Sequence, residues 1–186
     1  VVNHTFASDP DFSANAAQLS DGINNDADLY LLGGATLQIN QMETIGYLAS
    51  QKRSTVQIQT GAVLTLDDNT NHVLNGNIAG TGALALAATG GAAWYGLFGT
   101  NSLSSAIRIG SSSNIVTARI NDFNLGGPLG NAPDIVLGVA ALEDTAPQEA
   151  RLEYTGRSSL PQSVTQNIKL SNSGAVEVKS VVSAAN

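Results

Sequence analysis

The 186-residue chain contains no cysteine and few charged side chains. The absence of cysteine excludes disulfides, thiolate nucleophiles and zinc or iron sites that depend on thiolate ligands. Asp, Glu, Lys and Arg together make up 12% of the residues, well below the share of roughly 25% in typical soluble domains. We therefore expect a surface that is polar mainly through uncharged side chains.

Basic residues are especially scarce, since eight Lys and Arg stand against fifteen Asp and Glu, giving a net charge of -7. Such a chain repels phosphate backbones and offers no basic stripe for counterion release, so we expect no nucleic-acid partner. No apolar run approaches the length of a membrane span, which predicts no membrane insertion of this segment. The chain opens at Val1 without a basic leader, as expected for a mature or excised piece.

Short stretches of alternating apolar and polar residues recur along most of the chain. Leu84 and Leu86 share one face of such a stretch, with alanines on the other, as the period of two in a β-strand requires. Gly, Asn, Asp and Ser turns separate the stretches at short spacing, which indicates an all-β fold. The same alternation is found at residues 36–39, 56–59, 63–66, 107–109, 152–154, 168–170 and 176–179.

The alternation by itself is compatible with a sandwich, a barrel or a solenoid, and the repetition favours the solenoid. Units that open with Gly-Ala start at Gly34, Gly61, Gly82 and Gly174. Self-similarity at roughly 20 to 30 residues is typical of solenoid arrays, in which Leu, Ile and Val stack from one coil to the next. The uneven spacing of the units predicts loops of variable length between strands.

The first thirty residues lack this repetition. We therefore divide the chain into an N-terminal end segment or cap, residues 1–30, and solenoid repeats, residues 31–186. Pro10 and the helical spacing of Phe12, Ala16 and Leu19 predict one short helical turn in the end segment. An irregular or helical segment there would cover apolar side chains and strand edges that an open stack exposes.

The segment L-N-G-N-I-A-G-T-G-A-L-A-L, residues 74–86, resembles the core of the autotransporter-associated β-strand repeats of bacterial surface proteins. Flanking segments at residues 44–66 and 124–156 resemble the repeats on either side of that core. The resemblance covers most of residues 31–179 and departs from the family pattern at residues 87–94. It implies a right-handed parallel β-helix in a passenger-type protein, outside the cell or at the bacterial surface. It also implies a display, adhesive or scaffolding role, with no catalytic site and no cofactor.

Acidic residues are densest at Asp67 and Asp68 and at Asp26 and Asp28. On a parallel β-helix, carboxylates of neighbouring coils can bind calcium and act on acidic polysaccharides. Adjacent Asp residues in a strand point to opposite faces, however, and the glycine-rich calcium-binding nonapeptide is absent. We interpret these residues as solvated turn residues and predict no metal site.

His4 and His72 are the only imidazoles. His4 falls in the end segment, and His72 follows a run of turn-forming residues, so we expect it in a turn without a Ser-His-Asp device. A glycosidase pair would need two carboxyl groups at a set separation, and the acidic residues between strands read instead as a solvated loop. These acidic residues are Glu143, Asp144, Glu149 and Glu153.

A carbohydrate-active or carbohydrate-binding β-helix is the alternative hypothesis. A lyase-like site would require carboxylates and a basic residue converging on one outer face. The residues from which such a site could be assembled are Arg108, Arg119, Asp122 and Asp134.

Trp94, Tyr95 and Phe98 form the one aromatic-rich segment in a chain with 5% aromatic residues. We favour burial of these rings, where they contribute strongly to packing; exposed, they would stack on a surface glycan or dock a partner. The preferred hypothesis is a non-enzymatic stalk, adhesin or matrix component. Its repeats end near residue 186 without an obvious polar cap, which predicts self-association end to end or continuation in a longer chain.

Overall fold

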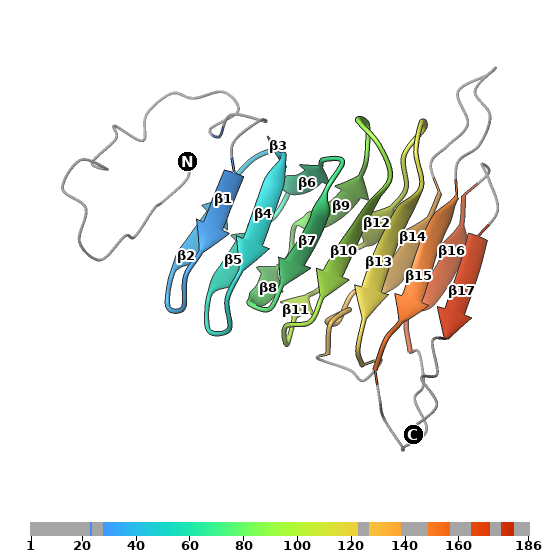
Figure 1. Cartoon of the computed structure of the whole chain (residues 1–186). Helices are drawn as coiled ribbons and strands as arrows, with labels where there is room; N and C mark the ends of the chain where they lie inside the picture. The colour runs from blue at the N-terminus through green and yellow to red at the C-terminus, as the bar shows by residue number, and fades with distance from the viewer. Residues whose placement is uncertain are drawn as a thin grey trace, which may run out of the picture.

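A computed structural model describes residues 23, 28–122, 127–138, 149–156 and 165–171, together with the backbone of residues 176–180. The described residues form an all-β parallel solenoid without helices (Figure 1), which confirms the predicted fold class. Every strand pairing is parallel, and the strands belong to three sheets that run side by side along the solenoid axis. None of the described residues forms a helix long and apolar enough to cross a membrane.

The three sheets are named A, B and C in the order in which the chain visits them. Sheet A contains β1 (Asp28–Leu31), β4 (Tyr47–Ser50), β7 (Asn71–Leu74), β10 (Ala93–Leu97), β13 (Val116–Ile120), β15 (Ala150–Tyr154) and β17 (Val176–Ser180). Sheet B contains β2 (Thr36–Ile39), β5 (Thr55–Ile58), β8 (Asn77–Gly80) and β11 (Ser102–Leu103). Sheet C contains β3 (Glu43–Ile45), β6 (Val63–Asp67), β9 (Ala83–Ala87), β12 (Ile107–Ile109), β14 (Asp134–Leu137) and β16 (Asn167–Leu170).

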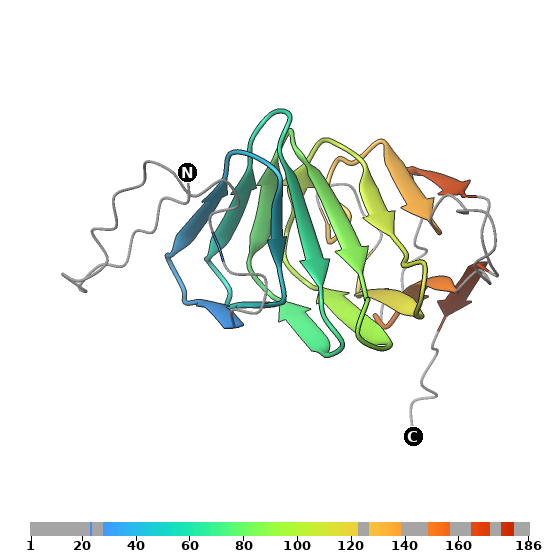
Figure 2. The same cartoon turned by 90° about the horizontal axis from the view of Figure 1, so that it is seen from above.

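Four complete coils pass through all three sheets, from β1–β3 to β10–β12, and the described strands of later coils belong to sheets A and C (Figure 2). At the fifth coil, residues 127–131 form turns in the place of a sheet B strand, and Asn131 donates its backbone N–H to Leu103 O of β11. Asn101 helps to hold these turns, because its Nδ2 donates to Pro128 O while its Oδ1 accepts the Ile78 N–H. The predicted loops of variable length are therefore present.

The core is a continuous stack of aliphatic side chains inside the coils. Leu84 and Leu86 are buried, as predicted, and they align with Leu64 and Leu66 of the preceding coil. On the other side they align with Ile107 and Ile109 of the following coil. Burial alternates along the strands because successive side chains point to opposite faces of each sheet.

The Gly-Ala units do not mark one position of the coil. The unit at Gly34 leads into β2 of sheet B, the units at Gly61 and Gly82 lead into β6 and β9 of sheet C, and the unit at Gly174 precedes β17 of sheet A. The similarity between units reflects a local device, a turn followed by a strand, which the chain uses at several corners. Sequence similarity alone thus overstates the regularity of the stack.

The two ends of the stack differ. At the first coil, Leu37, Ile39 and Ile45 are buried, and Ile23 packs on the core and donates its backbone N–H to Glu43 Oε1. β1 begins at Asp28, slightly before the predicted boundary at residue 31. The predicted helical turn, His4 and Asp26 lie outside the described residues.

At the last described sheet C strand, all four residues of β16 are exposed. The register aligns Ile168 with buried Ile135 and Leu170 with buried Leu137, yet Ile168 is 37% and Leu170 67% exposed. Positions that are inward in earlier coils are therefore open to solvent at this end.

Candidate functional site

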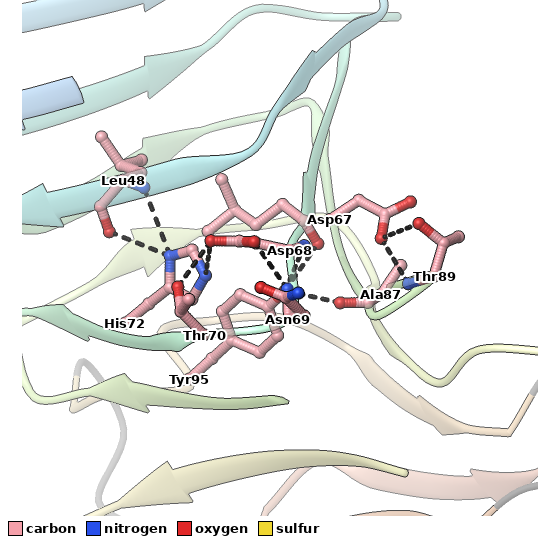
Figure 3. A network of polar contacts seen from close by, with 10 residues as sticks. Leu48, Asp67, Asp68, Asn69, Thr70, His72, Ala87, Thr89 and Tyr95 are labelled. Carbon is pink, nitrogen blue, oxygen red and sulfur yellow. Dashed lines mark hydrogen bonds and ion pairs between the residues drawn. The ribbon is translucent and has the colours of Figure 1, made fainter. Parts of the chain in front are cut away.

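Polar side chains gather at the corner where sheet C passes into sheet A, between the second and fourth coils (Figure 3). We call this group the corner network; it comprises Asp67, Asp68, Thr70, His72, Thr89 and Tyr95. Asp67 ends β6, the next three residues form a turn, and β7 carries His72 back along sheet A. Tyr95 lies in the adjacent strand β10, directly across from His72 in the register.

His72 is fully buried within a strand, which corrects the prediction of a turn position. Its Nδ1 lies 3.2 Å from the backbone nitrogen and 3.3 Å from the carbonyl oxygen of Leu48. Its Nε2 has no hydrogen-bond partner and faces Asp68 Oδ2 at 3.7 Å. In the sequence, the turn-forming residues just before His72 indicate a turn and give no sign of this inward position.

Burial lowers the pKa of His72, because the charged imidazolium loses its hydration; the Leu48 backbone and the Asp68 carboxylate oppose the shift. His72 is therefore neutral at pH 7. In the tautomer that carries the proton on Nε2, Nδ1 accepts the Leu48 N–H and the Nε2–H faces the Asp68 carboxylate. In this tautomer Nδ1 is hydrogen-bonded, and the Nε2 proton lies toward the carboxylate beyond hydrogen-bond distance.

Tyr95 anchors the other side of the network. Its hydroxyl contacts Ala87 O at 2.5 Å and Leu66 O at 3.1 Å, and its oxygen accepts the Asp68 N–H at 3.4 Å. Burial raises the pKa of Tyr95 far above its ordinary value, so the phenol stays protonated as a donor. The ring is fully buried, as favoured from the sequence, and is inaccessible to a surface glycan.

An aromatic ladder crosses the first four coils through this corner. It consists of Tyr30, Tyr47, His72 and Tyr95, one ring from each coil, with successive centroids 5.3, 5.0 and 4.5 Å apart. These separations match the strand spacing of about 4.8 Å in a parallel stack. Sequence reasoning missed the ladder; the recurrence of an aromatic or imidazole ring once per coil was the available signal.

The two adjacent aspartates, Asp67 and Asp68, accept hydrogen bonds at the turn after β6. Asp68 accepts hydrogen bonds from the Asn69 N–H and the Thr70 hydroxyl, and Asp67 accepts from the Thr89 N–H and hydroxyl in the next coil. The local bonds of Asp68 are of the kind that stabilises turns, whereas the bonds of Asp67 join neighbouring coils. In the described part of the chain, no group of three or more His, Cys, Asp or Glu side chains is arranged to hold a metal ion.

Trp94 and Phe98 lie on the outer side of sheet A, on either side of Gly96; both are half-buried, so the burial favoured from the sequence is complete only for Tyr95. A Cβ atom at Gly96 would lie 2.6 Å from Phe98 Cε2 and 3.2 Å from Trp94 Cζ3, so both rings rest against bare backbone. The Arg119 guanidinium lies 4.5 Å from the centroid of the Trp94 ring, and Arg119 Nε binds Glu153 Oε2 at 2.7 Å. A cation–π contact and an ion pair thus border the two rings.

The residues considered for a lyase-like site are divided between two sheets. Arg119 of β13 and Asp122 just after it belong to the sheet A side, whereas Arg108 of β12 and Asp134 of β14 lie in sheet C. Asp134 binds Lys169 and Asn167 of the next coil. The four side chains therefore do not converge on one outer face.

The structure describes two of the four acidic residues considered for a glycosidase pair. Glu149 pairs with Arg151, and Glu153 pairs with Arg119. Both carboxylates are thus engaged by arginines of sheet A. Glu143 and Asp144 lie outside the described residues.

Chemically, the corner network combines a buried neutral imidazole, a fixed carboxylate and a buried phenol that donates to backbone oxygens. Because His72 and Tyr95 are fully buried, their polar contacts stabilise the packing of neighbouring coils. Comparison with protein-family models finds no family that matches the chain. No curated protein and no solved structure matches it either.

Proposed function

We propose that this chain is a non-enzymatic structural segment of a bacterial cell-surface or extracellular protein, in which the solenoid serves as a stalk, adhesin or matrix component. The resemblance of residues 74–86 to autotransporter-associated repeats supports this proposal. The regular stack of coils around a continuous aliphatic core supports it too, because each added coil lengthens such an array along one rigid axis.

The exposed inward positions of β16 carry the proposal. Ile168 and Leu170 continue rows that are buried in every preceding sheet C strand, and their exposure leaves an apolar end surface beside an edge of β16 that pairs with no other described strand. Edges of this kind pair with any suitable strand that is available. We propose that this end receives a further coil, from a second copy of the chain or from the same polypeptide in a longer protein.

A second copy fits this end by its geometry. All strands of a sheet run in the same direction, so a copy moved along the axis presents its first coil in the parallel orientation of every other pair, with β1 following β17, the last described strand of sheet A. This contact is heterologous and does not close on itself, and it therefore extends into filaments.

The test combines sedimentation and negative-stain electron microscopy over a concentration series of the full chain. We expect concentration-dependent rods or filaments in the wild type and loss of assembly in Leu170→Glu. Arg108→Glu is the matched control, since Arg108 is exposed on the outer face of the same sheet. Equal assembly of both variants would contradict docking at β16, and a monomeric wild type at all concentrations would contradict self-association.

A carbohydrate contact on the outer side of sheet A is the second candidate function. The observation that favours it is the pair of half-buried rings, Trp94 and Phe98, beside the Arg119–Glu153 ion pair. Aromatic faces stack on the apolar faces of sugars, and charged planar groups bind their hydroxyls. We expect glycan-array binding that Trp94→Ala abolishes and Thr65→Ala leaves unchanged; absence of binding by the wild type would remove this candidate.

A further inference from the structure

The imidazole of His72 replaces a backbone partner between the second and third coils. Neighbouring strands of sheet A pair over four residues between β1 and β4 and again between β7 and β10. Between β4 and β7 the register consists of the single pair Ser50–Leu74. At Leu48, two residues before this pair, the N–H is bound by His72 Nδ1.

The position of Nδ1 permits two different hydrogen bonds with almost no movement. It lies 3.2 Å from Leu48 N and 3.3 Å from Leu48 O, so a bare Nδ1 accepts from the amide and a protonated Nδ1 donates to the carbonyl. We propose that His72 is a proton-operated latch between the second and third coils. Protonation transfers its bond from the Leu48 N–H to the Leu48 carbonyl oxygen and releases the amide.

Burial disfavours the charged form of His72, and Asp68 is the neighbouring anion that favours it. Tyr47 of β4 and Tyr95 of β10 cover the two faces of the ring, and Asp68 of the β6–β7 turn faces Nε2. Asp68 is held in place by its bonds to Asn69 and Thr70, so the acceptor for a charged Nε2–H is already oriented.

Other titratable groups lie one step further away. Asp67 lies beside Tyr95, and Tyr30 and Asp28 of β1 lie beside Tyr47. Asp68 is therefore the anion that faces the imidazole directly. The added proton comes from solvent, and no covalent bond changes.

The experiment uses the full chain with His4→Asn, which leaves His72 as the only histidine. NMR of the imidazole nitrogens is recorded between about pH 8 and pH 4, with hydrogen exchange of the Leu48 amide. At neutral pH we expect a bare Nδ1 and a protonated Nε2. On acidification, Nδ1 should become protonated, and Leu48 exchange should rise about tenfold relative to the Val56 amide of sheet B, as loss of one hydrogen bond predicts.

Two variants separate the latch from a merely structural contact. His72→Gln keeps a donor and an acceptor but cannot titrate in this range, so the pH dependence of Leu48 exchange should vanish. Asp68→Asn removes the facing anion and should move the imidazole transition to lower pH. A protonated Nδ1 at neutral pH, or the same acid response in His72→Gln, would overturn the proposal. If His72→Gln fails to fold, the imidazole titration in the His4→Asn background decides.

Discussion

The hydroxyl of Tyr95 lies 2.5 Å from the carbonyl oxygen of Ala87, at the corner where the third coil passes from sheet C into sheet A. The same hydroxyl contacts Leu66 O of the second coil. One phenol from the fourth coil therefore serves backbone oxygens of the two preceding coils. These carbonyls lie near the ends of the sheet C strands β6 and β9, where an acceptor shielded from water costs free energy if it has no donor.

Tyr95→Phe retains the ring and its stacking on His72 but removes the donor for these oxygens. We expect the free energy of unfolding to fall by about 1–3 kcal/mol, measured by urea unfolding. Tyr30→Phe is the control, because Tyr30 is 56% exposed. A similar loss in both variants would show that the Ala87 and Leu66 contacts contribute nothing particular.

Leu84→Asp places a charge inside the stack, at a position that is 1% exposed and aligned with Leu64 and Ile107. Removing the Leu side chain alone costs about 2–5 kcal/mol, and the unpaired carboxylate adds to this loss. We expect the thermal transition to fall sharply or disappear. Ala85→Asp, one residue on and facing outward opposite Arg108, should leave the melting curve nearly unchanged. Equal effects would mean that the inward face is misassigned.

Gly76→Ala tests the packing of the corner between sheets A and B. A Cβ atom at Gly76 would collide with Ser54 Oγ and lie 2.8 Å from the Ser54 carbonyl oxygen. We expect a loss of about 1–3 kcal/mol in the free energy of unfolding. The two coils could relieve the clash only by moving apart, which would break the backbone hydrogen bonds between their strands. Gly90→Ala is the matched control, since its Cβ would lie 3.4 Å from Asn69 atoms, an ordinary contact. Equal stability of the two variants would contradict this close packing.

Lys169 and Asp134 form an ion pair between β16 and β14, the last two described strands of sheet C. The hydrogen bond from Lys169 lowers the pKa of Asp134, and Asn167 and the Lys169 charge act in the same direction. The stability contributed by this pair is present above the ordinary Asp value of about 3.9 and is lost as pH falls through the lowered pKa.

Lys169→Met should therefore raise the Asp134 pKa toward its ordinary value, as followed by carboxyl NMR. Arg108→Met, on the neighbouring strand opposite Val136, should leave the Asp134 titration unchanged. If the Asp134 titration midpoint were the same in Lys169→Met as in the wild type, the ion pair would be absent in solution.

The strands and their inward residues were predictable because they depend on local properties. Alternation with a period of two sets which side chains share a face, and Gly, Asn and Asp set where the strand ends. Leu84, Leu86 and the other aliphatic rows followed directly from this pattern. Burial of Tyr95 also followed, since a large ring in a chain with few aromatic residues stabilises a core strongly.

The inward place of His72 depends instead on partners in other coils, such as Leu48, which lies 24 residues away. No local pattern specifies such a partner, because loop lengths set which residues of successive coils meet. For the same reason the similar Gly-Ala units lie on three sheets, and the arginines and aspartates considered for a catalytic site lie on two. Local sequence thus establishes the strands and their two faces, while stacking of the coils establishes the corner network, the aromatic ladder and the exposed end at β16.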